Sequence, residues 1–446
     1  MNPIFLEENK RYSLANFSEK FNERELDVFI QECSKRGIVK SHRGYEKKFS
    51  FEYVGIIIFD NRLVVCLPKY SSEEAGLDDK IALMKQIMEV LKIYSSESIQ
   101  EDELEFLGDS NDESVFNLLA AVDFFIKDYV ENGLYKNEKI EYVFDGSGEV
   151  DWQQTMDNHL PYVTKNQTPV YLELITQEVS YEGKHIIVGI HKKILNECCE
   201  YLSVTGLGEF LDYPNISFSL DLYELGNQEF QLNMIKKALY EDYNDRNLVL
   251  LRQLYNYLTQ GKSLISNEGI VFWGTRSFHT VWEKCCANIL GHQEEIKKFI
   301  PNPVWTNFDI KDTSKKTLIP DITKKYVQDE KNLLFIIDSK YYDIAFGAEK
   351  VKKNPGIEDV IKQYMYESSL HNYIKEKNID EWYNVFVFPT CAEGIEKIGE
   401  VSIEFLKDLK NVLLVKLPAK DIYNRYIQRQ KWESKEWDGF IEELNK

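Results

Sequence analysis

Residues 317–340 read TLIPDITKKYVQDEKNLLFIIDSK, and this stretch decides the fold of the C-terminal part of the chain. The apolar run 333–337 predicts a strand that is buried on both faces, because it has no alternation of apolar and polar residues. Asp321 follows a proline near the start of the stretch, and Asp338 closes the buried strand. Two carboxylates at the ends of neighbouring strands can converge on one hard divalent cation, which prefers oxygen ligands.

Two further groups belong to the same strand end. Lys340 lies on the same side of the strand as Asp338, because side chains alternate with a period of two, so its ammonium is expected to reach the same site. The backbone carbonyl of Ser339 is a candidate for a further metal ligand. A lysine at this place would stabilise charge that develops on a phosphate. The stretch therefore contains the parts needed for metal-dependent phosphodiester hydrolysis.

Two predicted helices add polar side chains to this site. Glu283 lies at the edge of the apolar face of the predicted helix 278–290, where we expect it to act as an extra metal ligand. Gln363 belongs to the predicted helix 357–375, and we expect it to orient DNA or the attacking water. In that prediction Gln363 shares a polar face with Asp359 and Tyr366. The opposite, apolar face is expected to consist of Ile357, Val360, Ile361, Tyr364 and Ser368.

Outward from this site, the pattern predicts three regions. In residues 266–446, predicted helices alternate with predicted strands, and the last helix begins at residue 421. This alternation is typical of an α/β sandwich with a mixed central sheet. The predicted strands lie near 304, 318–319, 333–337, 383–388 and 412–415. Residues 1–100 predict a small α+β module, with a helix at 25–33, strands at 51–59 and 63–68 and a second helix at 83–94, an order that a winged-helix unit shares. Residues 101–265 are largely helical, with helices at 116–130 and 230–258 and strands at 140–144, 171–179 and 185–190. The acidic stretch 95–114 is the best candidate for a linker.

Charge is unevenly distributed along the chain. Of its 446 residues, 54 are basic and 74 are acidic, so the formal net charge is −20. Residues 51–260 carry 16 basic and 37 acidic residues, whereas residues 261–446 carry 28 and 29. A groove for polyanionic DNA is therefore unexpected in the middle of the chain, while both ends are candidate nucleic-acid surfaces.

Composition also bears on the compartment. No run of 18 apolar residues occurs, and the N-terminus lacks the basic and apolar segments of a signal peptide, so we expect a cytoplasmic protein without a membrane span. Seven cysteines without a CxxC pair predict a reduced protein that has neither a disulfide frame nor a zinc cluster. Gly261-Lys262-Ser263 ends like a P-loop, but Asn256 stands where its first glycine should be, so nucleotide binding is not expected there.

The ordered motifs resemble the PD-(D/E)xK nuclease superfamily. They are Glu283, Ile319-Pro320-Asp321, Ile337-Asp338-Ser339-Lys340 and Lys362-Gln363. Over residues 50–390 the chain also looks like the McrC subunit of modification-dependent restriction systems, and in particular like LlaJI-type restriction endonucleases. The segments that support this likeness are 53–57, 67–70, 148–152 and Thr155.

The resemblance implies an activity, a cofactor and a partner. It implies a C-terminal domain that cuts double-stranded DNA with Mg²⁺, bound by Asp321, Asp338, Ser339 and Glu283, with Lys340 and Gln363 completing the catalytic set. It also implies an N-terminal part that engages a separate McrB-like AAA+ GTPase ring and stimulates its hydrolysis, in defence against foreign DNA. The family helix often continues as QxxxY, whereas Glu367 stands four residues after Gln363, so a role for Tyr364 or Tyr366 stays open.

Two other functions are compatible with the sequence. The chain could be an assembly and GTPase-activating subunit whose nuclease fold is vestigial. The intact Asp321, Asp338 and Lys340 argue against that alternative, because a site without chemistry does not need all three. The chain could also be an autonomous, site-specific nuclease, against which the long acidic region before residue 260 argues.

Overall fold

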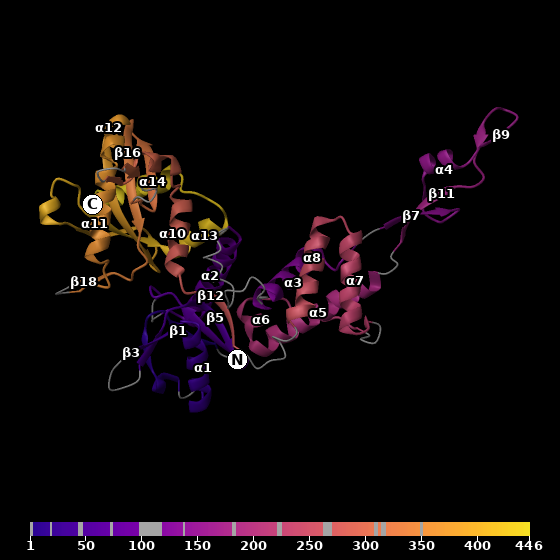
Figure 1. Cartoon of the computed structure of the whole chain (residues 1–446), viewed down its shortest axis with the longest axis horizontal. Coiled ribbons are helices and arrows are strands. Elements are labelled where there is room, and N and C mark those ends of the chain that lie inside the picture. Colours follow the sequence, from indigo (N-terminus) through magenta and orange to yellow (C-terminus); the bar gives the residue numbers. More distant parts are fainter. Residues whose placement is uncertain are drawn as a thin grey trace. The chain divides into compact units, whose positions relative to one another are not determined.

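The computed structural model describes residues 3–17, 20–42, 48–71, 75–97, 118–136, 139–180, 184–220, 225–261, 270–306, 311–313, 318–347 and 351–446. The chain forms two compact units, one of residues 112–271 and one that joins residues 2–111 to residues 272–446. Figure 1 labels the elements of each. The division into the regions 1–100, 101–265 and 266–446 stays a prediction. The overall mixture of helices and mixed sheets confirms the predicted α+β class.

The N-terminal part of the second unit is built on two small sheets. Its elements are β1 (Ile4–Glu7), β2 (Arg11–Ser13), α1 (Glu23–Lys35), β3 (Val39–His42), β4 (Lys48–Phe51), β5 (Val54–Phe59), β6 (Arg62–Leu67) and α2 (Leu77–Glu97). The strand orders are β2-β4-β3 and β1-β6-β5-β12, where β12 is Ile270–Thr275. The strand predicted at 51–59 is confirmed over Val54–Phe59, as β5, but it begins too early, because Phe51 belongs to β4 in a different sheet. The predicted helices and the return strand are confirmed.

The turn between β5 and β6 explains their register. Asp60 and Asn61 have φ values of 50° and 59°, which suit a two-residue hairpin turn and which Asp and Asn tolerate better than most residues. A glycine is required at position 55, near the beginning of β5, because a Cβ there would lie 2.3 Å from the carbonyl oxygen of Trp273 in β12. This close approach fixes β12 against β5, and β12 leads directly into the helix that carries Glu283.

The unit of residues 112–271 is mainly helical, as the sequence predicts. Its helices are α3 (Leu118–Asn132), α5 (Lys184–Thr205), α6 (Leu207–Phe210), α7 (Gln228–Glu241) and α8 (Asp245–Asn256). A separate group consists of β7 (Lys139–Phe144), β8 (Glu149–Val150), α4 (Trp152–Asn158), β9 (Tyr162–Val163), β10 (Pro169–Val170) and β11 (Ile175–Ser180). We call residues 139–180 the arm.

Two predictions fail in this unit. The strand predicted at 185–190 is the beginning of α5, whose buried residues Ile187, Ile190, Ile194 and Cys198 recur with the helical period. A short apolar run does not distinguish the two structures, and the continuing pattern decides for the helix. The strand predicted at 171–179 begins only at Ile175. The linker predicted at 95–114 lies mainly outside the described residues.

A five-stranded mixed sheet organises residues 318–446. Its order is β15 (Ile322–Gln328), β16 (Lys331–Ser339), β19 (Glu381–Thr390), β21 (Val412–Pro418) and β20 (Glu396–Val401). The three central strands β16, β19 and β21 are parallel, and the two edge strands pair antiparallel to them. The helices of this part are α10 (Phe278–Ile289), α11 (Ile357–Ser369), α12 (His371–Glu376), α13 (Ala419–Ile427) and α14 (Ser434–Leu444).

Helices cover both faces of this sheet. Leu334 and Ile336 of β16 pack in one cluster with Tyr366 and Leu370 of α11 and its C-terminal end. Phe335, which points the other way, lies against Trp437 and Phe440 of α14, with ring centroids 4.8 and 6.0 Å away. The predicted sandwich with a buried central strand is confirmed.

Three boundaries differ from the prediction. Residues 318–319 are not a strand, because β15 begins only at Ile322. The predicted helix 357–375 breaks at Leu370 into α11 and α12. The final helix is two helices, α13 and α14. Among the described residues, no helix has the length and apolar character that crossing a bilayer requires.

Candidate active site

Asp321 and Asp338 meet where β15 begins and β16 ends. The antiparallel register pairs Ile322 with Ile337, so the residue before β15 lies beside the carboxylate that follows Ile337. The backbone N–H of Ser339 donates to Oδ2 of Asp321 over 2.8 Å. Asp338 also contributes to the raised pKa of Asp321, as a neighbouring carboxylate does. The strand pairing therefore delivers the predicted convergence.

A third carboxylate approaches from α10. Burial and, to a smaller extent, the charge of Asp338 raise the pKa of Glu283 to about 7, against the opposing effect of Lys340. Burial, together with repulsion from Asp338 and Glu283, likewise raises the pKa of Asp321 to about 8. Each of these shifts records an acidic group that its neighbours discourage from ionising. The fold thus gathers three acidic groups at one buried place.

Lys340 closes the site between two aspartates. Its Nζ lies 2.6 Å from Oδ2 of Asp338 and 3.0 Å from Oδ1 of Asp359 in α11. Burial lowers the pKa of the ammonium, but the two carboxylates outweigh burial and raise that pKa above its ordinary value. The lysine is therefore a fixed cation beside Asp338, as the period of two predicts. Sequence reasoning placed Asp359 on the polar face of its helix but gave it no role at Lys340.

Gln363 is not brought to the carboxylates. Its side chain is fully buried, and its Nε2 donates to the carbonyl of Ile336 over 2.9 Å and to Oδ1 of Asn384 over 2.6 Å. Oε2 of Glu367 in turn accepts from Nδ2 of Asn384 over 3.1 Å. These bonds tie α11 to β16 and β19. The geometry does not support the predicted role of Gln363 in orienting DNA or water, and it favours a role in positioning β16.

The buried face of α11 was predicted only in part. Val360 and Tyr364 of the predicted apolar face are buried, whereas Ile357 and Ile361 are 63% and 38% exposed. Gln363, Tyr366 and Glu367 are buried as well. A polar network inside the fold thus adds polar residues to the buried side of the helix, and hydrophobic periodicity does not reveal them.

The two tyrosines of α11 have different surroundings. The hydroxyl of Tyr364 donates to the carbonyl of Val401 over 3.3 Å, away from the carboxylates. Burial raises the pKa of Tyr366, and the charges of Asp338 and Asp321 raise it further, so this phenol faces the acidic site. Of the two, Tyr366 is the tyrosine that the fold places near the candidate site.

The donor set suits a hard divalent cation. Asp321, Asp338 and Glu283 offer carboxylate oxygens, which Mg²⁺ prefers, and their mutual repulsion is what a bound cation would relieve. In the described part of the chain, no group of three or more His, Cys, Asp or Glu side chains already has the arrangement of a metal cluster. The Lys340 ammonium holds Asp338 in its place. The chemistry of the residues therefore fits Mg²⁺ with Asp321 and Asp338 as the nearest pair.

Neutralising one of these acids is expected to stabilise the cation-free protein. An Asp321→Asn variant removes a carboxyl group that burial and the charges of Asp338 and Glu283 keep from ionising, so the free energy of unfolding should rise by on the order of 1–3 kcal/mol. Thermal unfolding without divalent cations measures this. Mg²⁺ should then raise the unfolding temperature of the wild type but not that of the variant. A variant that is less stable than the wild type, or equally stabilised by Mg²⁺, would contradict the site.

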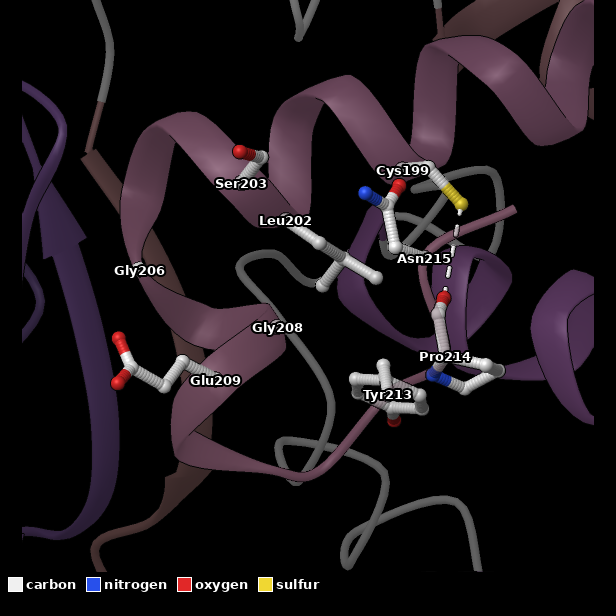
Figure 2. A pocket seen from close by; sticks show the side chains of 9 residues that line it. All are labelled: Cys199, Leu202, Ser203, Gly206, Gly208, Glu209, Tyr213, Pro214 and Asn215. Atoms are coloured by element: carbon white, nitrogen blue, oxygen red, sulfur yellow. Dashed lines mark hydrogen bonds between the residues drawn. The ribbon is translucent and has the colours of Figure 1, made fainter. Parts of the chain in front are cut away.

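A cavity of about 220 Å³ in the helical unit is a poorer candidate for chemistry. Figure 2 shows it between the end of α5 and the segment 213–215, where the thiol of Cys199 donates a hydrogen bond to the carbonyl of Pro214. Burial raises the pKa of the Cys199 thiol, so this sulfur is a weak nucleophile. Glu209 is the one acidic residue that lines this cavity, and it is exposed. No pair of catalytic groups lines it.

Comparisons with known proteins relate the chain to restriction enzymes. The model of a family described as "LlaJI restriction endonuclease" matches residues 53–420. A component of a type II restriction enzyme of Bacillus subtilis (strain 168), the BsuMI component YdjA, is 30% identical over 405 residues, which cover 89% of this chain and 84% of that protein.

Two solved assemblies contain chains of distant likeness. One is a half-complex of Thermococcus gammatolerans McrB AAA+ hexamers with bound McrC, matched over 96% of this chain and 99% of that chain at 13% identity and a TM-score of 0.39. The other is the McrBC complex of the same organism, matched over 58% of this chain and 80% of that chain at 13% identity and a TM-score of 0.26.

Proposed function

The chain belongs to the LlaJI restriction endonuclease family, and from that premise we propose that it is the subunit that hydrolyses DNA phosphodiester bonds in a restriction system that defends the cell against foreign DNA. It uses Mg²⁺, acts on double-stranded DNA in the cytoplasm, and works in concert with a separate McrB-like AAA+ GTPase subunit. The observation that carries the proposal is the meeting of Asp321, Asp338 and Lys340 at the end of β16.

The site residues have distinct roles in this proposal. Asp321 and Asp338 hold the cation, with the Ser339 carbonyl and Glu283 as further ligands. Mg²⁺ would supply positive charge to the phosphate that is attacked. Lys340 stabilises negative charge on that phosphate, because two carboxylates hold its ammonium at a fixed point. These residues are the acidic and basic set of a PD-(D/E)xK nuclease.

Two residues of α11 hold parts of the site in position. Asp359 is a second carboxylate partner of the Lys340 ammonium, at 3.0 Å. Gln363 joins α11 to the strand that carries Asp338 and Lys340. Both are positioning residues in this account, since neither is expected to touch the DNA. The catalytic part of the proposal therefore rests on Asp321, Asp338, Lys340 and Glu283.

The arm is the proposed contact with the GTPase. It exposes a concentration of large apolar side chains that a solvated surface does not need. The exposed fractions are 92% for Leu160, 68% for Val163, 67% for Phe144, 66% for Leu172, 65% for Tyr162 and 55% for Trp152. The related Bacillus protein is described as a component of an enzyme, which agrees with a chain that works beside another subunit.

Replacing apolar residues of the arm is expected to remove the partner's effect while leaving the nuclease fold intact. A Leu160→Asp and Tyr162→Ser double variant should lower stimulation of GTP hydrolysis by the chain roughly tenfold or more, because exposed aromatic and aliphatic anchors dominate interfaces. Asn166→Ala, in the same arm, is the matched control and should change nothing. Full stimulation by the double variant would place the contact elsewhere.

One reconstitution separates the proposed function from its alternatives. Plasmid DNA with Mg²⁺ is incubated with the wild-type chain, with and without the neighbouring GTPase and GTP. Cutting that requires the partner and GTP supports the proposal, whereas cutting by the chain alone favours an autonomous nuclease. If GTP hydrolysis rises without any cutting, the chain is an activating subunit and the proposal is wrong.

A further inference from the structure

A second cavity lies beside the strand end that carries Lys340. Its volume is about 560 Å³, and it is lined by residues 7–10 after β1, by Lys69 after β6, and by Tyr342, Asp343 and Lys353. All of these belong to the unit that contains the candidate active site. The cavity is therefore shared between the N-terminal part of that unit and its C-terminal sheet.

A tight turn connects this cavity to the catalytic lysine. The N–H of Tyr342 donates to the carbonyl of Lys340 over 3.0 Å, so the chain reverses within three residues. Consecutive Cα atoms are about 3.8 Å apart, which places the Cα atoms of Lys340 and Tyr342 within about 7 Å of each other. Phosphates recur about every 3.4 Å of axial rise along one DNA strand. A strand whose phosphate lies at Lys340 thus carries neighbouring phosphates within reach of the cavity.

Lys69 differs from the other two lysines of the cavity. Lys10 pairs with Glu7 over 3.5 Å, and Lys353 pairs with Asp343 over 2.6 Å. The Nζ of Lys69 lies over the ring of Tyr341, 4.2 Å from its centroid, and no described residue forms a hydrogen bond or an ion pair with it. Lys69 therefore keeps all three of its donors for another group.

The surroundings of Lys69 favour an anionic ligand. Burial lowers the pKa of its ammonium, and repulsion by Lys353 adds to this against the attraction of Glu8. Glu8 does not pair directly with the ammonium, because its Oε2 accepts from the hydroxyl of Tyr341 over 2.6 Å and weakly from the backbone N–H of Lys69. A half-buried cation without an oxygen partner is unfavourable, and an anion in the cavity would remove that cost.

We propose that Lys69 binds a backbone phosphate next to the phosphate that is cleaved, so that this cavity is a second phosphate subsite for DNA. This inference rests on the proposed function. It gives the N-terminal part of the chain a direct contact with substrate, although the chain as a whole is acidic. Three carboxylates line the cavity, and two of them, Glu7 and Asp343, are each neutralised by a lysine of their own. The third, Glu8, accepts from the hydroxyl of Tyr341, and burial raises its pKa, which disfavours its charged form.

The test compares Lys69→Met with Lys69→Arg under the conditions in which the wild type cuts DNA. Met keeps an apolar stem over Tyr341, and Arg keeps the charge. Lys407→Met, which replaces an exposed lysine that does not line the cavity, is the matched control. Lys69→Met should raise KM for DNA roughly tenfold, and the slope of log K against log salt should become shallower by about 0.9, the contribution of one phosphate contact. Lys69→Arg should restore most of both.

The outcomes distinguish this inference from the proposed function. If the wild type cuts and Lys69→Met changes neither KM nor the salt slope, the subsite is wrong and the nuclease stands. If the wild type does not cut, binding of duplex DNA is measured in Ca²⁺ as a function of the salt concentration. Equal slopes of log K against log salt for the wild type and Lys69→Met then overturn the subsite. If 10 mM inorganic phosphate raises the unfolding temperature only when Lys69 is present, while the DNA slope is unchanged, the cavity serves free phosphate and the DNA subsite is overturned.

Discussion

A Lys340→Met variant is expected to lose DNA cleavage by roughly 10³-fold, the usual effect of removing a fixed charge from the place where transition-state charge develops. The ammonium is held 2.6 Å from Asp338 and 3.0 Å from Asp359, so it reaches the phosphate without reorganising. Met fills nearly the same volume without the charge. Single-turnover cleavage of plasmid DNA measures the loss.

The control for Lys340 lies on the same strand. Lys331→Met replaces an exposed lysine at the other end of β16 and should cleave like the wild type. Lys340→Arg should recover little activity, because the planar guanidinium does not fit between two carboxylates that already hold a compact ammonium. Loss of activity in Lys331→Met as well would point to a general effect of strand charge. Near-normal cleavage by Lys340→Met would remove this lysine from the mechanism.

An Asp338→Asn variant is expected to lose cleavage by at least about 10³-fold, since it weakens the cation site and releases Lys340 at once. Asp338 is 3% exposed and lies at the centre of the acidic group. Asn has nearly the same shape, so the fold should persist. Stimulation of the partner's GTP hydrolysis should persist as well, because the arm is separate from this site in sequence.

Asp329→Asn is the control for Asp338. Asp329 lies in the exposed turn between β15 and β16 with a φ of 47°, which Asn also adopts readily. This variant should cleave normally. If Asp338→Asn lost GTPase stimulation together with cleavage, the separation of roles between arm and sheet would be wrong. If it still cleaved, another group would bind the cation.

The central sheet and the acidic pair could be predicted because their signals are local. A continuous apolar run, an aspartate after a proline, and an Asp–Lys pair at a spacing of two fix the strand, the neighbour and the side that faces the site. The register of β15 against β16, in which Ile322 pairs with Ile337, then places Asp321 beside Asp338. The N-terminal helix α1 was equally readable from its apolar spacing and its end at Gly37.

The environment of α11 could not be predicted, because its buried face is polar. Gln363 and Glu367 are buried and form hydrogen bonds with Asn384, which lies 21 positions after Gln363. No pattern within the helix predicts such a partner. Asp359 was missed as a partner of Lys340 for a related reason, and the sequence indicated Lys69 only as a structural lysine with a phosphate contact as the alternative. Their relevance comes from contacts with Lys340 and Tyr341, which are distant in sequence. Long-range polar contacts carry no periodic signal.

The α5 error has a different origin. The run HIIVGI at 185–190 has the composition of a strand, and a window of six residues cannot reveal a helical period. The period appears only when Ile194 and Cys198 are included. Tertiary packing of that longer face then overrides the β-branched composition.

The most direct test of the central claim is cleavage by a chain that lacks both aspartates. Plasmid DNA is incubated with Mg²⁺, GTP, the neighbouring GTPase and the wild-type chain, beside a reaction in which every copy carries Asp321→Asn and Asp338→Asn. The account predicts nicked or linear DNA in the first reaction and intact plasmid in the second, with GTP hydrolysis stimulated in both. Equal cutting in the two reactions would contradict it, because the phosphodiester bond would then be hydrolysed at another site.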